Sequence, residues 1–197
     1  SNTVNPLPFP VFNSDSYIYC LNSTEPLPIS VQVGFKYYAW NTGEEGRNLN
    51  KIYIDSPGTY SVEVTNEYNC TNRVSVEVLP SNIATITDLE ILDFHGSDNS
   101  VTIIVQGEGD YEYALNNTSQ FQNDNFFNGL LNGYHTVYVR DKNGCGTVSK
   151  EFLVLDYPRF FTPNDDGIHD YWNIIGMNKF PNSKIYIFDR FGKLLKI

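Results

Sequence analysis

The chain repeats itself at an interval of 75 residues, and this repeat limits its fold more than any other feature. Residues 38–41 (Tyr-Ala-Trp-Asn) align with residues 113–116 (Tyr-Ala-Leu-Asn), and Gly58 aligns with Gly133. In both copies, the residues that follow this glycine alternate between two sets, one for each face of a strand. A period of two is typical of a half-buried strand. The repeated positions are Tyr60, Val62 and Val64 in the first copy and His135, Val137 and Val139 in the second.

Short strands separated by turns, in units of about 75 residues, predict an all-β protein built from tandem immunoglobulin-like β-sandwiches. The composition agrees, because 15% of the residues are aromatic and aromatic side chains pack well on a pleated sheet. We predict the first repeat at residues 1–80 and the second at 81–156. Pro158 interrupts the strand pattern, so we place a separate C-terminal module at 157–197.

The overall charge limits the classes of partner. A formal net charge of −10 disfavours nucleic acids and anionic membranes, which are bound through Lys and Arg. No run of 18 apolar residues occurs, so we predict no membrane span. Since the chain begins at Ser1 without Met, we expect an internal fragment or a processed product.

No catalytic motif is present. The sequence lacks a Ser/His/Asp arrangement, an H-E-x-x-H helix, a P-loop and a G-x-S-x-G turn. Acidic pairs such as Glu44 and Glu45 could in principle serve a glycosidase, but a solvated acidic surface is the interpretation we favour. Trp40 is expected in the core, because Leu115 replaces it in the second copy; the alternative is an exposed platform that stacks on sugars. We predict that the chain is not an enzyme.

The last forty residues carry the most specific motif. Residues 160–172 read F-F-T-P-N-D-D-G-I-H-D-Y-W, and residues 185–195 read I-Y-I-F-D-R-F-G-K-L-L. Together they closely resemble the start of the gliding-motility-associated, type B form of the C-terminal sorting domain found in Bacteroidota proteins exported by type IX secretion. Two departures are Asp165, where the family favours Gly, and His169, where it favours Asn. Residues 38–44 and 111–116 are similar to the immunoglobulin-like and PKD-like repeats of Bacteroidota surface adhesins.

This resemblance implies export across the outer membrane, followed by display at the cell surface or release. It also implies recognition by the type IX secretion machinery, including an outer-membrane partner of the SprF/PorP type. Forty residues are too few for a self-sufficient sandwich, so we expect an incomplete β-sandwich sorting module. The alternative function is a surface adhesin or glycan-binding stalk in which the sandwiches hold the ligand. The residues that we expect to carry sorting recognition are Phe161, Thr162, Pro163, Asn164, Asp166, Gly167, Asp170 and Trp172.

The polar residues of this motif allow two interpretations. Asn164, Asp166 and Asp170 could supply oxygen ligands to Ca²⁺. They could instead accept hydrogen bonds from nearby backbone amides and so build the turn. We favour the turn and keep calcium as the alternative cofactor. His169 as a ligand for a transition metal is weaker still, because no Cys or second His lies near it in the sequence.

The three cysteines complete the set of predictions. A secreted route permits disulfides, and a bridge between an early and a late strand would join the two sheets of one sandwich. We therefore predict a Cys20–Cys70 disulfide. Cys145 aligns with Cys70, but His95 stands where a second partner would be expected, so we predict a free Cys145. The alternative is three reduced, buried thiols.

Overall fold

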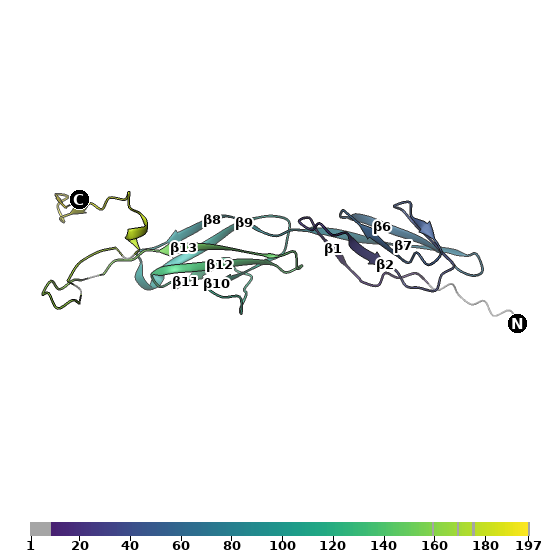
Figure 1. Cartoon of the computed structure of the whole chain (residues 1–197), viewed down its shortest axis with the longest axis horizontal. Coiled ribbons are helices and arrows are strands. Elements are labelled where there is room, and N and C mark those ends of the chain that lie inside the picture. The colour runs from purple at the N-terminus through teal and green to yellow at the C-terminus, as the bar shows by residue number, and fades with distance from the viewer. Residues whose placement is uncertain (1–8, 159, 169, 175, 197) are drawn as a thin grey trace. The chain divides into compact units, whose positions relative to one another are not determined.

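The computed structural model describes residues 9–158, 160–168, 170–174 and 176–196. The described chain is all-β, as predicted, and its helical turns are two short 3₁₀ helices, η1 (Gly96–Asp98) and η2 (Met177–Lys179). Neither of these turns is long and apolar enough to cross a membrane. Figure 1 labels the main strands.

Contacts divide the chain into two compact units. Unit 1 comprises Ser1–Thr85, Gln106–Tyr111 and Arg140–Thr147, and unit 2 comprises Ile86–Val105, Glu112–Val139 and Val148–Ile197. Two short segments from the second half of the chain therefore belong to unit 1. The boundaries that we predicted after residues 80 and 156 remain predictions.

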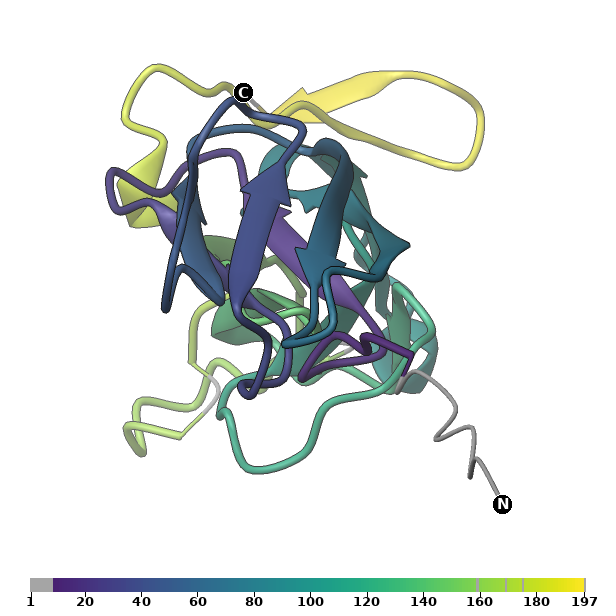
Figure 2. The same ribbon diagram turned by 90° about the vertical axis from the view of Figure 1, so that its right-hand side faces the viewer.

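Unit 1 contains two sheets, drawn in purple to blue in Figure 2. The larger has the order β1-β7-β6-β3-β4, and the smaller pairs β2 with β5 in antiparallel fashion. Strand β1 runs parallel to β7, and this register places Cys20 beside Ser81. The strands are β1 (Tyr17–Cys20), β2 (Leu27–Ser30), β3 (Tyr37–Trp40), β4 (Glu45–Gly46), β5 (Lys51–Ile54), β6 (Gly58–Thr65) and β7 (Thr71–Ser81).

One apolar cluster holds the two sheets of unit 1 together. Ile29 and Ile52 enter it from the small sheet, and Tyr38, Val62 and Val64 enter it from the large sheet; each is at most 2% exposed. Burial of such side chains contributes about 25 cal/mol per Å² of apolar surface. The result is the predicted β-sandwich.

Trp40 lies in this core and not on the surface. It is 4% exposed, and its Nε1 donates a hydrogen bond to the backbone oxygen of Leu49 at 2.8 Å. The polar edge of the indole is thus satisfied while the ring is buried, as buried Trp requires. The predicted core position is confirmed, and Trp40 is not a sugar platform.

Unit 2 is built from two three-stranded sheets, with the orders β11-β9-β8 and β10-β12-β13. Val101 and Ile103 from one sheet and Ala114, Val137 and Val139 from the other are fully buried. The strands are β8 (Thr85–Leu92), β9 (Ser100–Gln106), β10 (Tyr111–Leu115), β11 (Phe126–Asn128), β12 (Gly133–Asp141) and β13 (Thr147–Val154).

The internal repeat is visible in the strand order. β6 lies between β3 and β7 in unit 1, and β12 lies between β10 and β13 in the second copy. His135, which replaces Tyr60, stacks on Phe152 with ring centroids 5.5 Å apart. The repeated alternation of residues therefore forms equivalent strands, and His135 has a packing role, as predicted.

The predicted Cys20–Cys70 bridge is wrong. Cys20 is bonded to Cys145 across 125 residues of sequence, and Cys70 is free and exposed. The parallel register of β1 and β7 explains the error, because Cys20 lies beside Ser81 while Cys70 precedes the opposite end of β7. At about 3.3 Å per residue, the length of β7 keeps the two sulfur atoms far beyond bonding distance.

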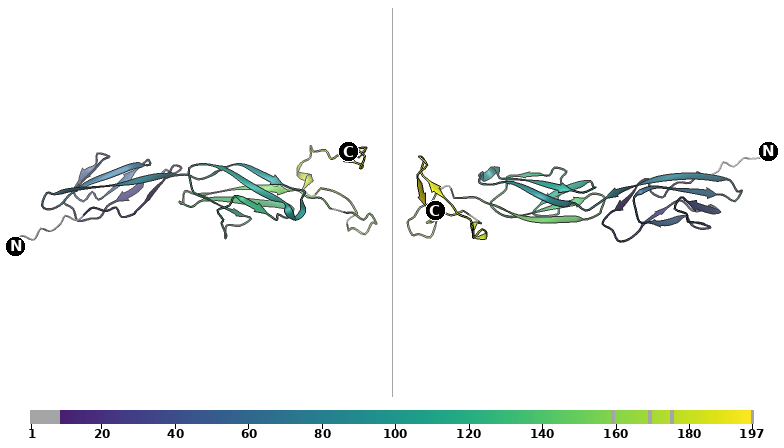
Figure 3. Two further views of the ribbon diagram at one scale, coloured as in Figure 1. Left: turned by 180° about the vertical axis from the view of Figure 1, so that it is seen from behind. Right: turned by 90° about the horizontal axis from the view of Figure 1, so that it is seen from above.

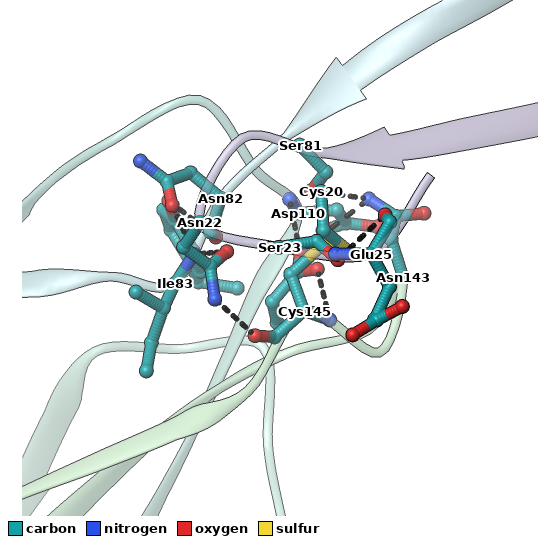
Figure 4. Close-up of a disulfide and its surroundings, with 12 residues drawn as sticks. Cys20, Asn22, Ser23, Glu25, Ser81, Asn82, Ile83, Asp110, Asn143 and Cys145 are labelled. Carbon is teal, nitrogen blue, oxygen red and sulfur yellow. Dashed lines mark hydrogen bonds between the residues drawn. A yellow bond between two sulfur atoms is a disulfide. The ribbon is translucent and has the colours of Figure 1, made fainter. Parts of the chain in front are cut away.

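Cys145 reaches Cys20 because the turn that carries it belongs to unit 1 (Figure 4). Asp141, which is 1% exposed, accepts a hydrogen bond from the backbone N–H of Cys145 at 3.1 Å. The Nδ2 group of Asn22 donates to the backbone oxygen of Cys145 at 3.1 Å. The Nδ2 group of Asn143 donates to Ser81 Oγ, also at 3.1 Å. Hydrogen bonds thus hold both ends of the disulfide in place.

The C-terminal module ends in a small hairpin of β14 (Ile187–Phe188) and β15 (Leu194–Lys196). Figure 3 shows the whole segment in yellow-green to yellow.

Candidate functional site

The loop at residues 162–170 is organised by one carboxylate. Asp170 Oδ1 accepts the backbone N–H groups of Asn164 at 3.0 Å and Asp165 at 2.8 Å. Asp170 Oδ2 accepts the N–H of Gly167 at 2.7 Å. Hydrogen bonds to an ionised acceptor are stronger than neutral ones, so this side chain fixes the path of the loop.

The same contacts change the acidity of Asp170. Partial desolvation raises its pKa, but the backbone N–H groups of Asn164, Gly167, Asp165 and Asp166 outweigh that effect and hold the pKa below its usual value. Donors that point at a carboxylate stabilise its charged form. Asp170 is therefore ionised at neutral pH, and both of its carboxylate oxygens accept hydrogen bonds from the loop.

A second carboxylate closes the tip of the loop. Asp166 Oδ1 accepts the N–H of Ile168 at 2.7 Å, and Asp166 Oδ2 accepts the Nδ2 group of Asn164 at 2.9 Å. Thr162 Oγ1 donates to the backbone oxygen of Ile168 at 3.3 Å. These are the local side-chain-to-backbone bonds expected of Asx residues in turns.

This geometry favours the turn interpretation of the motif over calcium. The oxygens that would have to face a cation already accept N–H groups of the loop itself. Among the described residues, no group of three or more His, Cys, Asp or Glu side chains could hold a metal ion. Calcium at Asn164, Asp166 and Asp170 stays a prediction, and His169 lies outside the described residues.

Trp172 closes the base of the loop. Its Nε1 donates to the backbone oxygen of Pro158 at 3.0 Å. Its ring lies 6.2 Å from that of Tyr157, and Tyr157 lies 6.1 Å from Phe94. This distance between centroids is within the range of favourable aromatic pairs, so the predicted recognition residue Trp172 also anchors the loop.

The loop and its two ends expose large apolar side chains. Phe160 is 64% exposed, Phe161 51%, Ile168 64% and Tyr171 83%. Large apolar groups gathered on a surface mark interaction sites more often than isolated ones do. Six of the eight predicted recognition residues thus lie in the loop at residues 162–170, and Phe161 and Trp172 flank it.

The hairpin that follows is shaped in the same way. Asp189 Oδ1 accepts the N–H groups of Phe191 and Lys193, both at 2.9 Å. Phe188 is 56% exposed and Phe191 80%. Acidic turn residues therefore build both halves of the motif and leave aromatic side chains at the surface.

A pocket of about 670 Å³ is lined by residues that lie between the loop and the hairpin in the sequence. Its volume is within the range of small-molecule sites, but none of its lining residues can act as an acid, a base or a nucleophile, which catalysis needs. The lining residues are Asn173, Ile174, Gly176, Met177, Asn178 and Ile185.

Sequence reasoning missed two positions that hold this segment. Phe94 lies in the second repeat, 66 residues before Phe160 at the start of the motif, and no periodicity links it to Tyr157. Gly176 packs against Leu153, and a Cβ atom there would lie 2.9 Å from Leu153 Cδ2. For the contact between Gly176 and Leu153, the one signal in the sequence was a glycine that follows apolar residues.

Comparison with protein families identifies this segment. Residues 155–195 match the family described as "CHU_C Type IX secretion signal domain". The match covers the loop, the pocket and the hairpin. No curated protein matches the chain.

Solved structures with related architecture are distant. A C-terminal fragment of intimin in complex with the intimin-binding domain of its translocated receptor shares 12% identity, with a TM-score of 0.47 over 78% of this chain and 66% of that chain. A titin I-band fragment, I67–I69, shares 12% identity, with a TM-score of 0.44 over 79% of this chain and 70% of that chain. A murine CEACAM1b structure shares 10% identity, with a TM-score of 0.42 over 74% of this chain and 98% of that chain.

Proposed function

We propose that the C-terminal segment is an export and sorting signal, and that the two sandwiches form a non-catalytic part of a protein displayed at the cell surface or secreted. The match of residues 155–195 to a type IX secretion signal domain is the observation that carries the proposal.

The proposed partner is the type IX secretion machinery, including an outer-membrane protein of the SprF/PorP type. The loop and the residue before it offer a fixed shape with exposed apolar groups, because Phe161 is 51% exposed and Ile168 64%. Asp166 and Asp170 hold that shape through the hydrogen bonds described above. Recognition of a preformed surface avoids much of the entropy cost of ordering a loop on binding.

Strand addition is the binding mode that the hairpin supports. β14 and β15 form a two-stranded sheet in the described part of the chain. An open sheet edge can accept a strand from a partner, with main-chain hydrogen bonds providing affinity. The exposed side chains Phe188 and Leu195 would then give apolar contacts.

A reporter experiment tests the proposal. The whole chain is fused to the C-terminus of a fluorescent protein that carries an inner-membrane export leader, and expressed in a gliding Bacteroidota host. We expect fluorescence on cells or in the medium, and its loss when the secretion channel is deleted. Export of equal amount in the channel mutant would contradict the proposal.

Variants then test the loop. Asp166→Ala combined with Asp170→Ala removes both organising carboxylates, and we expect export to fall. Asp88→Ala combined with Glu90→Ala is the matched control, because it removes two exposed charges from strand β8 of the same unit. Full export of the loop variant would show that the loop is not part of the recognition site.

A glycan-binding role for unit 2 is the second candidate. A groove of about 540 Å³ there is lined by amide, hydroxyl and apolar side chains and has no charged group, a lining that suits a neutral sugar. Binding of neutral oligosaccharides on an array, lost in Gln120→Ala, would support it, and no binding would count against it. The lining residues are Leu115, Asn117, Ser119, Gln120, Phe121, Gln122 and Phe127.

A further inference from the structure

The sorting segment is packed on the sandwich of unit 2 through three separate contacts. The first is aromatic: the ring of Phe94 lies 6.1 Å from that of Tyr157, which in turn lies 6.2 Å from Trp172. The backbone N–H of Phe94 also donates to the oxygen of Leu155 at 3.3 Å. This joins the end of strand β8 to the start of the segment.

The backbone of Phe94 shows that this contact constrains the chain. Its φ is +63°, a region that is unfavourable for a bulky side chain and usually marks a constraint. Phe94 remains 37% exposed, so burial of its ring in the core does not account for the conformation. In this conformation the ring of Phe94 pairs with Tyr157 and its N–H bonds to Leu155.

The second contact is a close approach of backbone. At Gly176 the φ is +90°, and an added Cβ would lie 2.9 Å from Leu153 Cδ2 and 3.1 Å from Leu155 Cδ2. Leu153 belongs to strand β13. Any other residue would be strained at this φ, and its Cβ would force the two leucine side chains to move.

The third contact is a cation over an aromatic ring. Lys179 Nζ lies 5.9 Å from the centroid of the Tyr134 ring on strand β12. Such a pair contributes about 0.5–1 kcal/mol at an exposed site. It places η2 against a strand different from the one that Gly176 approaches.

From these contacts we infer that the sandwich of unit 2 is a docking surface for the sorting segment, formed by Phe94, Tyr134 and Leu153, and that export requires the segment to be docked on it. The inference rests on the proposed sorting function and names the part of the chain that presents the signal. The signal would then extend beyond the matched residues 155–195, to positions in the second repeat.

Energetics explain why the segment needs this support. About forty residues bury too little apolar surface to fold alone. Its own strands have two and three residues, and its large side chains Tyr171 and Phe191 are at least 80% exposed. Contacts with the sandwich replace the core that the segment lacks.

The decisive variant is Phe94→Ala combined with Tyr134→Ala in the whole chain, because both residues lie outside the matched signal. Docking is measured by acrylamide quenching of tryptophan fluorescence. Trp40 is 4% exposed, so the quenching reports mainly on Trp172. We expect the quenching constant to rise severalfold and export of the reporter fusion to be lost.

Two controls separate docking from general damage. Phe126→Ala combined with Leu131→Ala removes exposed apolar groups of the same unit outside the docking surface, and should leave quenching and export unchanged. Gly176→Val changes a residue of the segment itself and should also release the segment from the sandwich. Gly129→Val is its control, because Gly129 also has a positive φ, +70°, but nothing lies within 4 Å of an added Cβ.

The outcomes distinguish this inference from the proposed function. Increased quenching with full export would overturn the requirement for docking and leave the sorting function intact. Unchanged quenching in the Phe94 and Tyr134 variant would overturn the docking surface itself. If the unaltered chain is not exported, the sorting function fails and the requirement for docking with it.

Discussion

At the scale of single residues, carboxylates and not an apolar core hold the turns of the C-terminal segment. Asp170, Asp166 and Asp189 each accept backbone N–H groups and close a turn. The sequence predicted turn-building at Asp166 and Asp170 from residue types alone, because Asx side chains bond to neighbouring backbone. It could not predict that Asp170 organises both halves of the loop, since that requires the folded path of the chain.

One residue of the loop is conformationally strained. Asp165 has a φ of +59° and stands where the resemblance to the sorting family leads us to expect Gly. Asp165→Gly should stabilise the loop by about 0.5 kcal/mol, the relief of left-handed strain less the extra entropy of glycine in the unfolded chain. Slower amide exchange at Asn164 and Gly167 would show the gain. Faster exchange in the variant would contradict it.

Acid should loosen the same loop. The pKa of Asp170 is lower in the folded state than in the unfolded chain, so its contribution is complete above the ordinary pKa of about 4 and is lost as the pH falls through the lower, folded value. NMR titration should show the amide protons of Asn164, Asp165 and Gly167 shifting together over that range. Asp170→Asn should abolish this common transition; its persistence would assign the effect to another group.

At the scale of strands and their connections, the periodicity of the sequence predicted where strands form. It did not predict which strands pair. The alternation around Val62 and Val137 correctly predicted strands β6 and β12, because side chains on a strand alternate between faces. The parallel pairing of β1 with β7 leaves no local signature in the sequence, and it is this pairing that separates Cys20 from Cys70. The contacts of Phe94 with Tyr157 and of Gly176 with Leu153 are equally non-local.

The disulfide should be a major source of stability for unit 1. Closing a loop of 125 residues stabilises the folded state by about 5 kcal/mol in the chain-entropy model. Cys145→Ala should lower the free energy of unfolding by about that amount in urea. Cys70→Ala is the matched control, because Cys70 is free and exposed, and it should change the free energy by less than about 0.5 kcal/mol. Equal effects of the two variants would contradict the pairing.

At the scale of the whole molecule, the Cys20–Cys145 bond changes how the chain carries force. A pull on the two termini passes through the sulfur atoms and bypasses the covalent loop between them. In single-molecule stretching, reductant should add roughly 400 Å of contour length, from 125 residues at about 3.4 Å each. The Cys145→Ala variant should show the full length without reductant. An oxidised chain that already extends to its full length would contradict the prediction.

The central claim is that residues 155–195 direct export and do so when docked on the second sandwich. The most direct measurement compares export of the reporter fusion in the host and in its channel-deletion mutant, for the unaltered chain and for Phe94→Ala with Tyr134→Ala. We predict channel-dependent export of the unaltered chain and its loss in the variant. Absence of export from the unaltered chain, or equal export from both chains, would contradict the claim.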